Sequence, residues 1–170
     1  ELERLRDLTG ETVRLAILDG DEILYVDQRE ALRTVRIGNG VGGRASAHAS
    51  GAGKAILAQL DPLIREQVLN RLVLKRFTPN SIVDRGELVQ QLDLTKARGY
   101  SVSVEEQHEG VNSVAVAILD HRARAIGAIA VLGPSYRLGP DRLHALGRDV
   151  MEAARRVSGN AGQVAMSITI

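Results

Sequence analysis

The sequence predicts a single α+β domain, in which an antiparallel sheet carries helices on its faces. The chain has 170 residues, enough for one domain with a substantial apolar core. Its short apolar runs come in consecutive pairs joined by polar turns, as in β-hairpins. The helical segments are grouped between two sets of strands instead of alternating with single strands, which argues against βαβ winding. The expected order is one helix, three strands, a group of helices, three strands and a final helix.

The first segments predict a helix followed by a hairpin. Residues 1–10, "ELERLRDLTG", carry leucines at helical spacing and end on glycine, so they read as the end of a linker helix. The apolar runs Val13–Leu18 and Ile23–Val26 flank "DGDE", in which Asp-Gly is a strong hairpin turn signal. The stretch "TVRIG", beginning at Thr34, predicts a third strand that glycines then end.

Three helices are predicted in the middle of the chain, separated by turn signals. Ser50–Leu60 has apolar residues on one face, and the pair Asp61-Pro62 is typical of the first residues of another helix. The stretch "RFTPNSIV" reads as a loop. "DRGE", from Asp84, resembles a capping box, and the helix that it begins is expected to end at Gly99.

The last third of the chain predicts three strands and one helix. Tyr100–Glu105 alternates polar residues with valines, as a half-buried strand does, and "EEQHEG" then reads as a polar loop. "NSVAVAILD" and "AIGAIAVLG" are two strands joined by the turn "HRAR". A helix with apolar residues three or four positions apart begins near Pro140, and residues 159–170 are expected to form a loose tail.

Composition excludes several classes of function. The 22 basic and 21 acidic residues give a net charge of +1. Binding to a nucleic-acid backbone requires a clustered positive surface, so this balance argues against nucleic-acid binding by this segment alone. Aromatic residues make up 2%, too few for stacking platforms, and the chain has no cysteine for a disulfide or a thiolate metal site. No signal peptide or long apolar stretch is visible, so we expect a cytoplasmic protein. Because the first residue is not methionine, we expect an excised domain.

Two nucleotide-binding patterns can be tested against the sequence. A P-loop requires G-x-x-x-x-G-K-[ST], but Gly53-Lys54 is followed by Ala55, and His48 stands where the first glycine belongs. "GNGVGG", Gly38–Gly43, does satisfy G-x-G-x-x-G. However, "RASAHA" separates it from the next helix, whereas a dinucleotide site needs the motif to begin that helix. A glycine-rich turn is therefore the favoured interpretation, and no cofactor is predicted.

Catalytic and metal-binding patterns are also weak. A nucleophile elbow requires glycines two residues either side of its serine, which Ser50 lacks, so Ser50 is predicted to cap the helix. The adjacent acids Glu105 and Glu106 would point to opposite sides of a strand and cannot form a glycosidase pair. Folding can bring His108 near Glu105, Glu106 or Glu109, but solvated loop charge is favoured over a metal site there. No catalytic residue and no metal are predicted.

The small residues at the start of the predicted helix at Ser50 allow two interpretations. Gly51 and Ala52 expose backbone N–H groups at the positive end of a helix dipole, where a carboxylate can approach closely. Alternatively, the small residues only let the helix pack against the sheet, and sequence alone favours this second interpretation. Lys54 either meets a ligand carboxylate or, as is commoner for a lysine on a helix, faces solvent or a nearby acid.

Four segments resemble the signature blocks of the effector-binding domain of the IclR family of transcriptional regulators. They are "HASGAGKAILAQL", "FTPNSI", "LTKARGYSVSVEEQHEGVNSVAVAILD" and "AIAVLGPSYR", in the family's order and spacing, and the resemblance covers roughly Leu5 to Val157. It implies a GAF-like fold with a curved antiparallel sheet. It also implies a small-molecule effector, usually an organic or aromatic acid, a homodimer or dimer of dimers, and DNA binding by a separate N-terminal winged helix-turn-helix that is absent from this chain.

The resemblance also implies which residues surround the effector. Backbone N–H groups at the helix start, two serine hydroxyls and an apolar wall would meet the ligand, together with two residues before "GP" that are apolar here and serine in many relatives. Because lost hydroxyls weaken the binding of a ligand that needs them, we expect a larger, more apolar acid or a neutral aromatic compound rather than a two- or three-carbon acid. The implied ligand-binding residues are Ile37, Ala45, Gly51, Ala52, Ser103, Val111, Ser113, Ala130 and Leu132.

Two functional readings remain open beside the sensor domain of a transcriptional regulator. The chain can be a stand-alone GAF-like sensor domain, because this scaffold serves many roles. It can also be an orphan regulator whose pocket has collapsed. An enzyme is not expected, because no convincing nucleophile or acid–base set is found.

Overall fold

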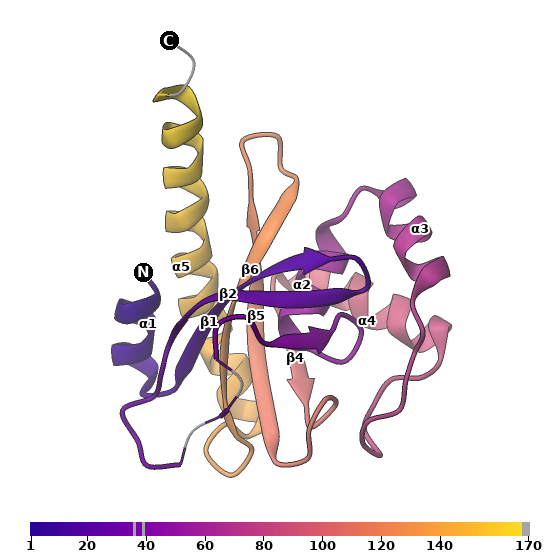
Figure 1. Ribbon diagram of the computed structural model, residues 1–170, viewed down its shortest axis with the longest axis horizontal. Helices are drawn as coiled ribbons and strands as arrows, with labels where there is room; N and C mark the ends of the chain where they lie inside the picture. The colour runs from indigo at the N-terminus through magenta and orange to yellow at the C-terminus, as the bar shows by residue number, and fades with distance from the viewer. Residues whose placement is uncertain (36, 39, 168–170) are drawn as a thin grey trace.

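The computed structural model describes residues 1–35, 37–38 and 40–167, with side chains as far as residue 159. Within this part, six antiparallel strands form one curled sheet in the order β3-β2-β1-β6-β5-β4 (Figure 1), so the predicted α+β class is confirmed. The elements are α1 Leu2–Thr9, β1 Thr12–Asp19, β2 Glu22–Arg29, β3 Arg44–Ser46, α2 Gly51–Gln59, α3 Pro62–Arg71, α4 Arg85–Arg98, β4 Ser101–Val104, β5 Val111–Leu119, β6 Ala125–Pro134 and α5 Pro140–Ser167.

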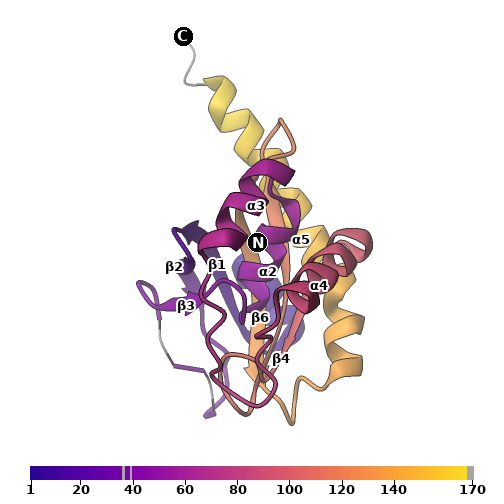
Figure 2. The ribbon, with the colours of Figure 1, turned by 90° about the vertical axis from the view of Figure 1, so that its right-hand side faces the viewer.

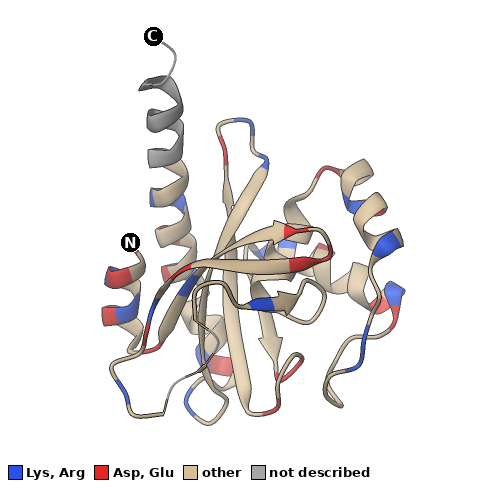
Figure 3. Cartoon of the chain, viewed as in Figure 1, with Lys and Arg blue, Asp and Glu red and all other residues tan. Residues whose placement is uncertain are grey.

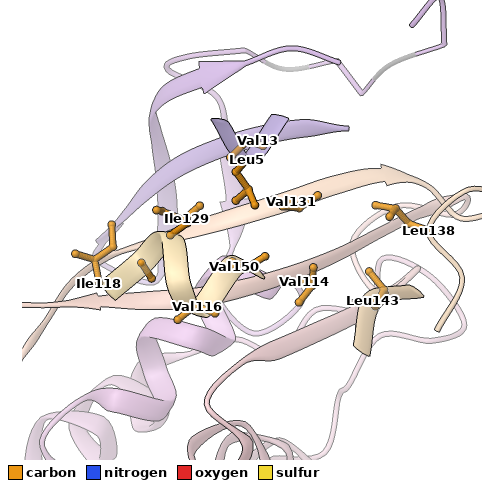
Figure 4. Packing of buried hydrophobic residues seen from close by; sticks show 12 residues of the cluster. Leu5, Val13, Val114, Val116, Ile118, Ile129, Val131, Leu138, Leu143 and Val150 are labelled. Atoms are coloured by element: carbon orange, nitrogen blue, oxygen red, sulfur yellow. The ribbon is translucent and has the colours of Figure 1, made fainter. Parts of the chain in front are cut away.

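Helices cover both faces of the sheet. α1 and α5 pack on one face, while α2 packs on the other face with α4 behind it (Figures 1 and 2). The core under α5 is aliphatic: Leu5, Val13, Val114 and Val150 are fully buried in it (Figure 4). Because both faces are covered, both sets of alternating side chains on β1, β5 and β6 are largely buried.

The face beneath α2 consists mostly of small side chains. Ala115, Ala128 and Ala130 of the sheet belong to the same buried cluster as Ala52 of α2. α2 also lies close to the turn that precedes it, since a Cβ on Gly53 would lie 2.2 Å from the backbone oxygen of Ala47. Glycine is therefore required at that position for α2 to sit where it does.

The predicted first hairpin is confirmed. β1 and β2 pair from Val13 opposite Arg29 to Asp19 opposite Glu22, with one register shift between Leu15 and Ala16. Gly20 supplies the positive φ of the turn, at 66°. α1 likewise ends before Gly10, as the leucine spacing predicts.

The predicted strand "TVRIG" is wrong. Residues 34, 35, 37 and 38 are bends or irregular backbone, and residue 36 lies outside the described residues. The third strand is β3, where Ala45 pairs with Ile23 of β2. Backbone hydrogen bonds to β2 begin at Gly42 and Gly43, which both bond to Tyr25, and regular pairing follows only from Arg44, where Ala45 is buried.

The three predicted helix starts in the middle of the chain are confirmed with their caps. Ser50 Oγ accepts a hydrogen bond from the N–H of Gly53 at 3.1 Å, Asp61 Oδ1 from that of Leu63 at 2.9 Å, and Asp84 Oδ1 from Glu87 at 2.8 Å. α4 ends before Gly99, as predicted, where φ is 88°. Capping is local chemistry, which explains why sequence alone predicts it well.

The C-terminal helix is longer than predicted. Residues 159–167 continue α5 to Ser167, so the expected loose tail is wrong as far as that residue, and residues 168–170 lie outside the described residues. No proline interrupts the stretch after Ser158, so the helical ladder can continue. Among the described helices, none is long and apolar enough to cross a membrane.

Charged side chains of both signs are interspersed over the described helices and strands (Figure 3). Most ion pairs are exposed, such as Arg85 with Glu66 and Arg65 with Asp93. Among the described residues, two pairs are buried and join distant parts of the chain. One joins Lys54 to Glu106 at 2.5 Å, and the other joins Arg137 to Glu11, whose side chain is 0% exposed.

Candidate ligand-binding site

A cavity of about 290 Å³ lies between the start of α2 and the face of the sheet that α2 covers. Segments from β1, β2, β3, β4, β5 and β6 contribute to its wall, together with the loop after β2 and the loop after β4. The structure brings all nine of the ligand-binding residues implied by the sequence to this one wall: Ile37, Ala45, Gly51, Ala52, Ser103, Val111, Ser113, Ala130 and Leu132.

Strand register explains why residues far apart in the sequence meet in the cavity. Ala130 of β6 lies opposite Ala115 of β5 on one side and opposite Arg14 of β1 on the other. In the next row, Ser113 lies opposite Ser103 and Leu132. Directly opposite residues share one face of a sheet, so both rows point toward α2.

The start of α2 shows why glycine is needed there and what it exposes. A Cβ on Gly51 would lie 2.6 Å from Ser113 Oγ, so the glycine allows the helix to approach β5. Ser50 satisfies the N–H of Gly53, but the N–H groups of Gly51 and Ala52 find no acceptor among the described residues. The packing interpretation of the small residues is therefore confirmed, and the same residues leave two backbone donors at the cavity wall.

The serines of the site have different roles. Ser103 Oγ donates to the carbonyl of Ala49 at 3.0 Å, and Ser101 Oγ donates to that of Gly51 at 2.6 Å. These bonds fasten the start of α2 to β4, so Ser103 has only its oxygen lone pairs left for a ligand. Ser113 Oγ has no hydrogen-bond partner among the described residues, and its hydroxyl is available to both donors and acceptors.

Arg14 is a wall residue that the sequence analysis missed. Its residue surface is only 2% exposed, and burial lowers the pKa of its guanidinium. Nε donates to Gln28 Oε1 at 2.7 Å, and Nη2 donates to the backbone oxygens of Ile37 and Gly38. The guanidinium also lies over the ring of Tyr25, 4.5 Å from its centroid. The sequence signal for Arg14 was a cation in the middle of an apolar run, but strand alternation predicts that such a side chain faces solvent.

Other residues of the cavity wall that the sequence analysis missed are polar, and contacts within the protein already use some of their polar atoms. Arg44 pairs with Asp19 at 2.5 Å and with Glu22 at 3.3 Å. Gln107 Oε1 accepts from the N–H of Ser46 at 3.0 Å, and its neighbour His108 also reaches the wall. Among the described residues that line the cavity, none is Asp or Glu. The cavity therefore has a positive electrostatic character that favours an anion.

Lys54 lies behind the cavity wall and points to an acid. Its side chain is 2% exposed and binds Glu106 Oε1, while Glu106 Oε2 has no partner among the described atoms. Burial lowers the pKa of Lys54 and raises that of Glu106. The pair holds the loop after β4, which carries Gln107 and His108, against α2. In the part of the chain that the structure describes, no three His, Asp or Glu side chains are grouped to hold a metal ion.

Comparison with known proteins places the chain among regulators. Residues 1–159 match the family model described as "Bacterial transcriptional regulator IclR C-terminal". The chain is 41% identical over 157 residues to the HTH-type transcriptional regulator BhcR of Paracoccus denitrificans, covering 92% of this chain and 56% of that protein. It thus spans little more than half the length of this relative.

Two solved structures support the same relationship. The IclR protein of Thermotoga maritima superposes with a TM-score of 0.90 at 28% identity, covering 95% of this chain and 65% of that one. The inducer-binding domain of a PobR double mutant from Acinetobacter, in complex with 3-hydroxybenzoic acid, has a TM-score of 0.82 at 26% identity, covering 92% of this chain and 93% of that domain. The curved sheet implied by the family resemblance is therefore confirmed.

Proposed function

We propose a function from the premise that this chain belongs to the IclR family of bacterial transcriptional regulators and corresponds to its C-terminal domain. In this proposal, the chain senses a small organic or aromatic acid. The observation that carries the proposal is the cavity at the start of α2. Two backbone donors and a buried arginine line it, and no acidic side chain is found among its described wall residues. This donor set suits an anion and leaves it no competing charge of the same sign.

The size and walls of the cavity indicate an acid with an apolar body. About 290 Å³ is near the lower end of the range for small-molecule pockets. Ala130 and Leu132 contribute no hydroxyl, and Ile37, Ala45 and Val111 add apolar surface. That the related PobR domain holds 3-hydroxybenzoic acid supports an aromatic or comparably apolar carboxylate.

We further propose that the signal acts on operator DNA through a separate N-terminal domain, in the cytoplasm and in a homodimer or dimer of dimers. For a ligand to act, it must bind two arrangements of the regulator with different affinity, because equal affinity shifts no population. The near-neutral net charge of +1 agrees with a sensor whose DNA-binding surface lies elsewhere. Nothing in the site calls for an enzymatic role, and we propose none.

A thermal-shift screen against organic and aromatic acids tests the proposal. A ligand present at 100 times its Kd should stabilise the fold by about 2.7 kcal/mol. Gly51→Val and Ser113→Ala should remove that shift, whereas Gly159→Ala, in α5 and away from the cavity wall, should keep it. If no acid in a broad library stabilises the chain, the sensor proposal is wrong and the orphan regulator takes its place.

A further inference from the structure

We propose that Arg14 binds the ligand's carboxylate, so that the acid is recognised from β1 and not chiefly from the helix start. This inference rests on the proposed function and specifies it. The N–H groups of Gly51 and Ala52 are then left for a second, neutral oxygen of the ligand. The ligand class that follows is a monocarboxylate with an apolar body and an acceptor oxygen such as a hydroxyl or keto group.

The first support is that Arg14 is a buried cation without a contacting carboxylate among the described residues. The partners that touch its guanidinium are neutral: Gln28 Oε1, the carbonyls of Ile37 and Gly38, and the ring and hydroxyl of Tyr25. Glu30 influences Arg14 from farther away and accepts a hydrogen bond from Gln28 Nε2 at 3.3 Å. Buried charges are normally paired, so this site lacks the counter-ion that a carboxylate would supply.

The second support is the position of Arg14 on the cavity wall. It is the direct cross-strand neighbour of Ala130, on the sheet face that α2 covers. The small side chain of Ala130 leaves space beside the guanidinium. Nε and Nη2 make the bonds to Gln28 and to the loop carbonyls, so Nη1 is the nitrogen of the fork that takes part in none of them. Planar guanidinium groups match the geometry of a carboxylate through parallel N–H bonds.

The third support comes from the other arginine of the wall. Arg44 also lines the cavity, but Asp19 and Glu22 already neutralise it and it is more exposed. A ligand carboxylate would therefore gain little by displacing those partners. Arg44 provides a matched control, because it has the same side chain, lies on the same wall and has its charge compensated.

A structural role for Arg14 gives a different expectation. Its bonds to Ile37 and Gly38 hold the loop after β2, and loss of these bonds would disturb any ligand in the cavity, charged or not. Carboxylate recognition, in contrast, affects only ligands that carry the charge. Pairs of compounds that differ solely in that charge separate the two roles.

The experiment is calorimetric titration of the chain with 3-hydroxybenzoate and a series of aliphatic and aromatic monocarboxylates, each paired with its primary amide. In the unaltered chain we expect the acid to bind more tightly than its amide. In Arg14→Gln the affinity for the acid should fall about tenfold or more, as expected for a lost charge-assisted bond, while that for the amide stays within about threefold. Arg44→Gln should leave the preference for the acid unchanged.

Each alternative result has a definite meaning. If Arg14→Gln keeps the preference for the acid, or loses acid and amide equally, Arg14 does not bind the carboxylate, although the sensor proposal survives. If the unaltered chain binds none of the acids, the sensor proposal itself fails. Should Arg14→Gln not fold, Arg14→Lys keeps the charge without the planar fork, and a smaller drop confined to the acids is expected. An unchanged Arg14→Lys preference would overturn the inference.

Discussion

His48 is a buried histidine whose surroundings fix its protonation. Nε2 lies 3.0 Å from the carbonyl oxygen of Lys75, and Nδ1 lies 2.7 Å from Ser46 Oγ. A carbonyl can only accept, so Nε2 carries a proton, and in the neutral ring Nδ1 then accepts from the serine hydroxyl. Burial lowers the pKa of His48 below its usual 6.5, which favours the neutral ring at neutral pH.

We expect this histidine to make the fold less stable in acid. Between its lowered folded pKa and 6.5, the unfolded chain binds a proton that the folded chain does not, so the free energy of unfolding falls as pH drops below 6.5. The slope from this one group is at most about 1.4 kcal/mol per pH unit. Urea unfolding at several pH values between 5 and 7 measures it. His48→Asn should flatten the profile; an equal slope in both chains would contradict the assignment.

Lys54 and Glu106 form a pair in which either partner alone is a buried, uncompensated group. Glu106→Gln leaves Lys54 buried without its anion, and we expect a loss of about 3–5 kcal/mol in the free energy of unfolding. Denaturant unfolding measures this. The double variant Lys54→Met/Glu106→Leu removes both charges and should recover most of the loss. If that double variant is as unstable as Glu106→Gln, the cost lies in the shape of the site and not in its charge.

At the scale of elements, the contact between α2 and the preceding turn decides where the cavity lies. Gly53→Ala places a Cβ that would be 2.2 Å from the oxygen of Ala47, so backbone must move, and we expect a loss of more than about 2 kcal/mol. Gly159→Ala is the matched control: nothing lies within 4 Å of its added Cβ, and a gain of up to about 1 kcal/mol is expected. Thermal unfolding compares the two. A tolerated Gly53→Ala would show that α2 can shift on the sheet.

The elements best predicted from sequence are those defined by local chemistry. The hairpin turn at Gly20 and the caps at Ser50, Asp61 and Asp84 depend on neighbours within a few residues, and all were predicted. The third strand was misplaced because β3 exists only through its pairing with β2, a non-local event.

Arg14 was missed for a related reason. Alternation along β1 places Val13 and Arg14 on opposite faces, and a charged face normally indicates solvent. Here α5 covers one face and α2 the other, so the face of Arg14 is also interior. The nine wall residues were predicted from the family resemblance, which indicates the positions that surround the ligand. It does not indicate a charged side chain, such as Arg14, that a further strand contributes.

At the scale of the whole molecule, Glu11 and Arg137 connect two segments that lie far apart in the sequence. Arg137 Nε and Nη2 donate to the two carboxylate oxygens of Glu11, each at 2.8 Å, linking the start of β1 to the segment between β6 and α5. Arg137→Ala leaves Glu11 buried and unpaired, and should cost about 3–5 kcal/mol. Arg29→Ala removes an exposed pair with Asp27 and should cost less than about 1 kcal/mol. Equal losses in denaturant unfolding would contradict this ranking.

The loop after β2 is held by two arginines with different surroundings. Arg14 donates to the carbonyls of Ile37 and Gly38 in the cavity. Arg137 donates to the carbonyl of Val35 at 3.0 Å and also binds Glu11, which lies two residues past the end of α1. A ligand that competes for Arg14 therefore acts on the same segment that is fastened beside α1. Such linkage is reciprocal. A restraint that favours one position of α1 changes the affinity of the cavity for its ligand. By the same factor, the bound ligand favours that position of α1. For the proposed regulator, this reciprocity predicts that operator binding changes the affinity for the ligand by the same factor by which the ligand changes the affinity for the operator.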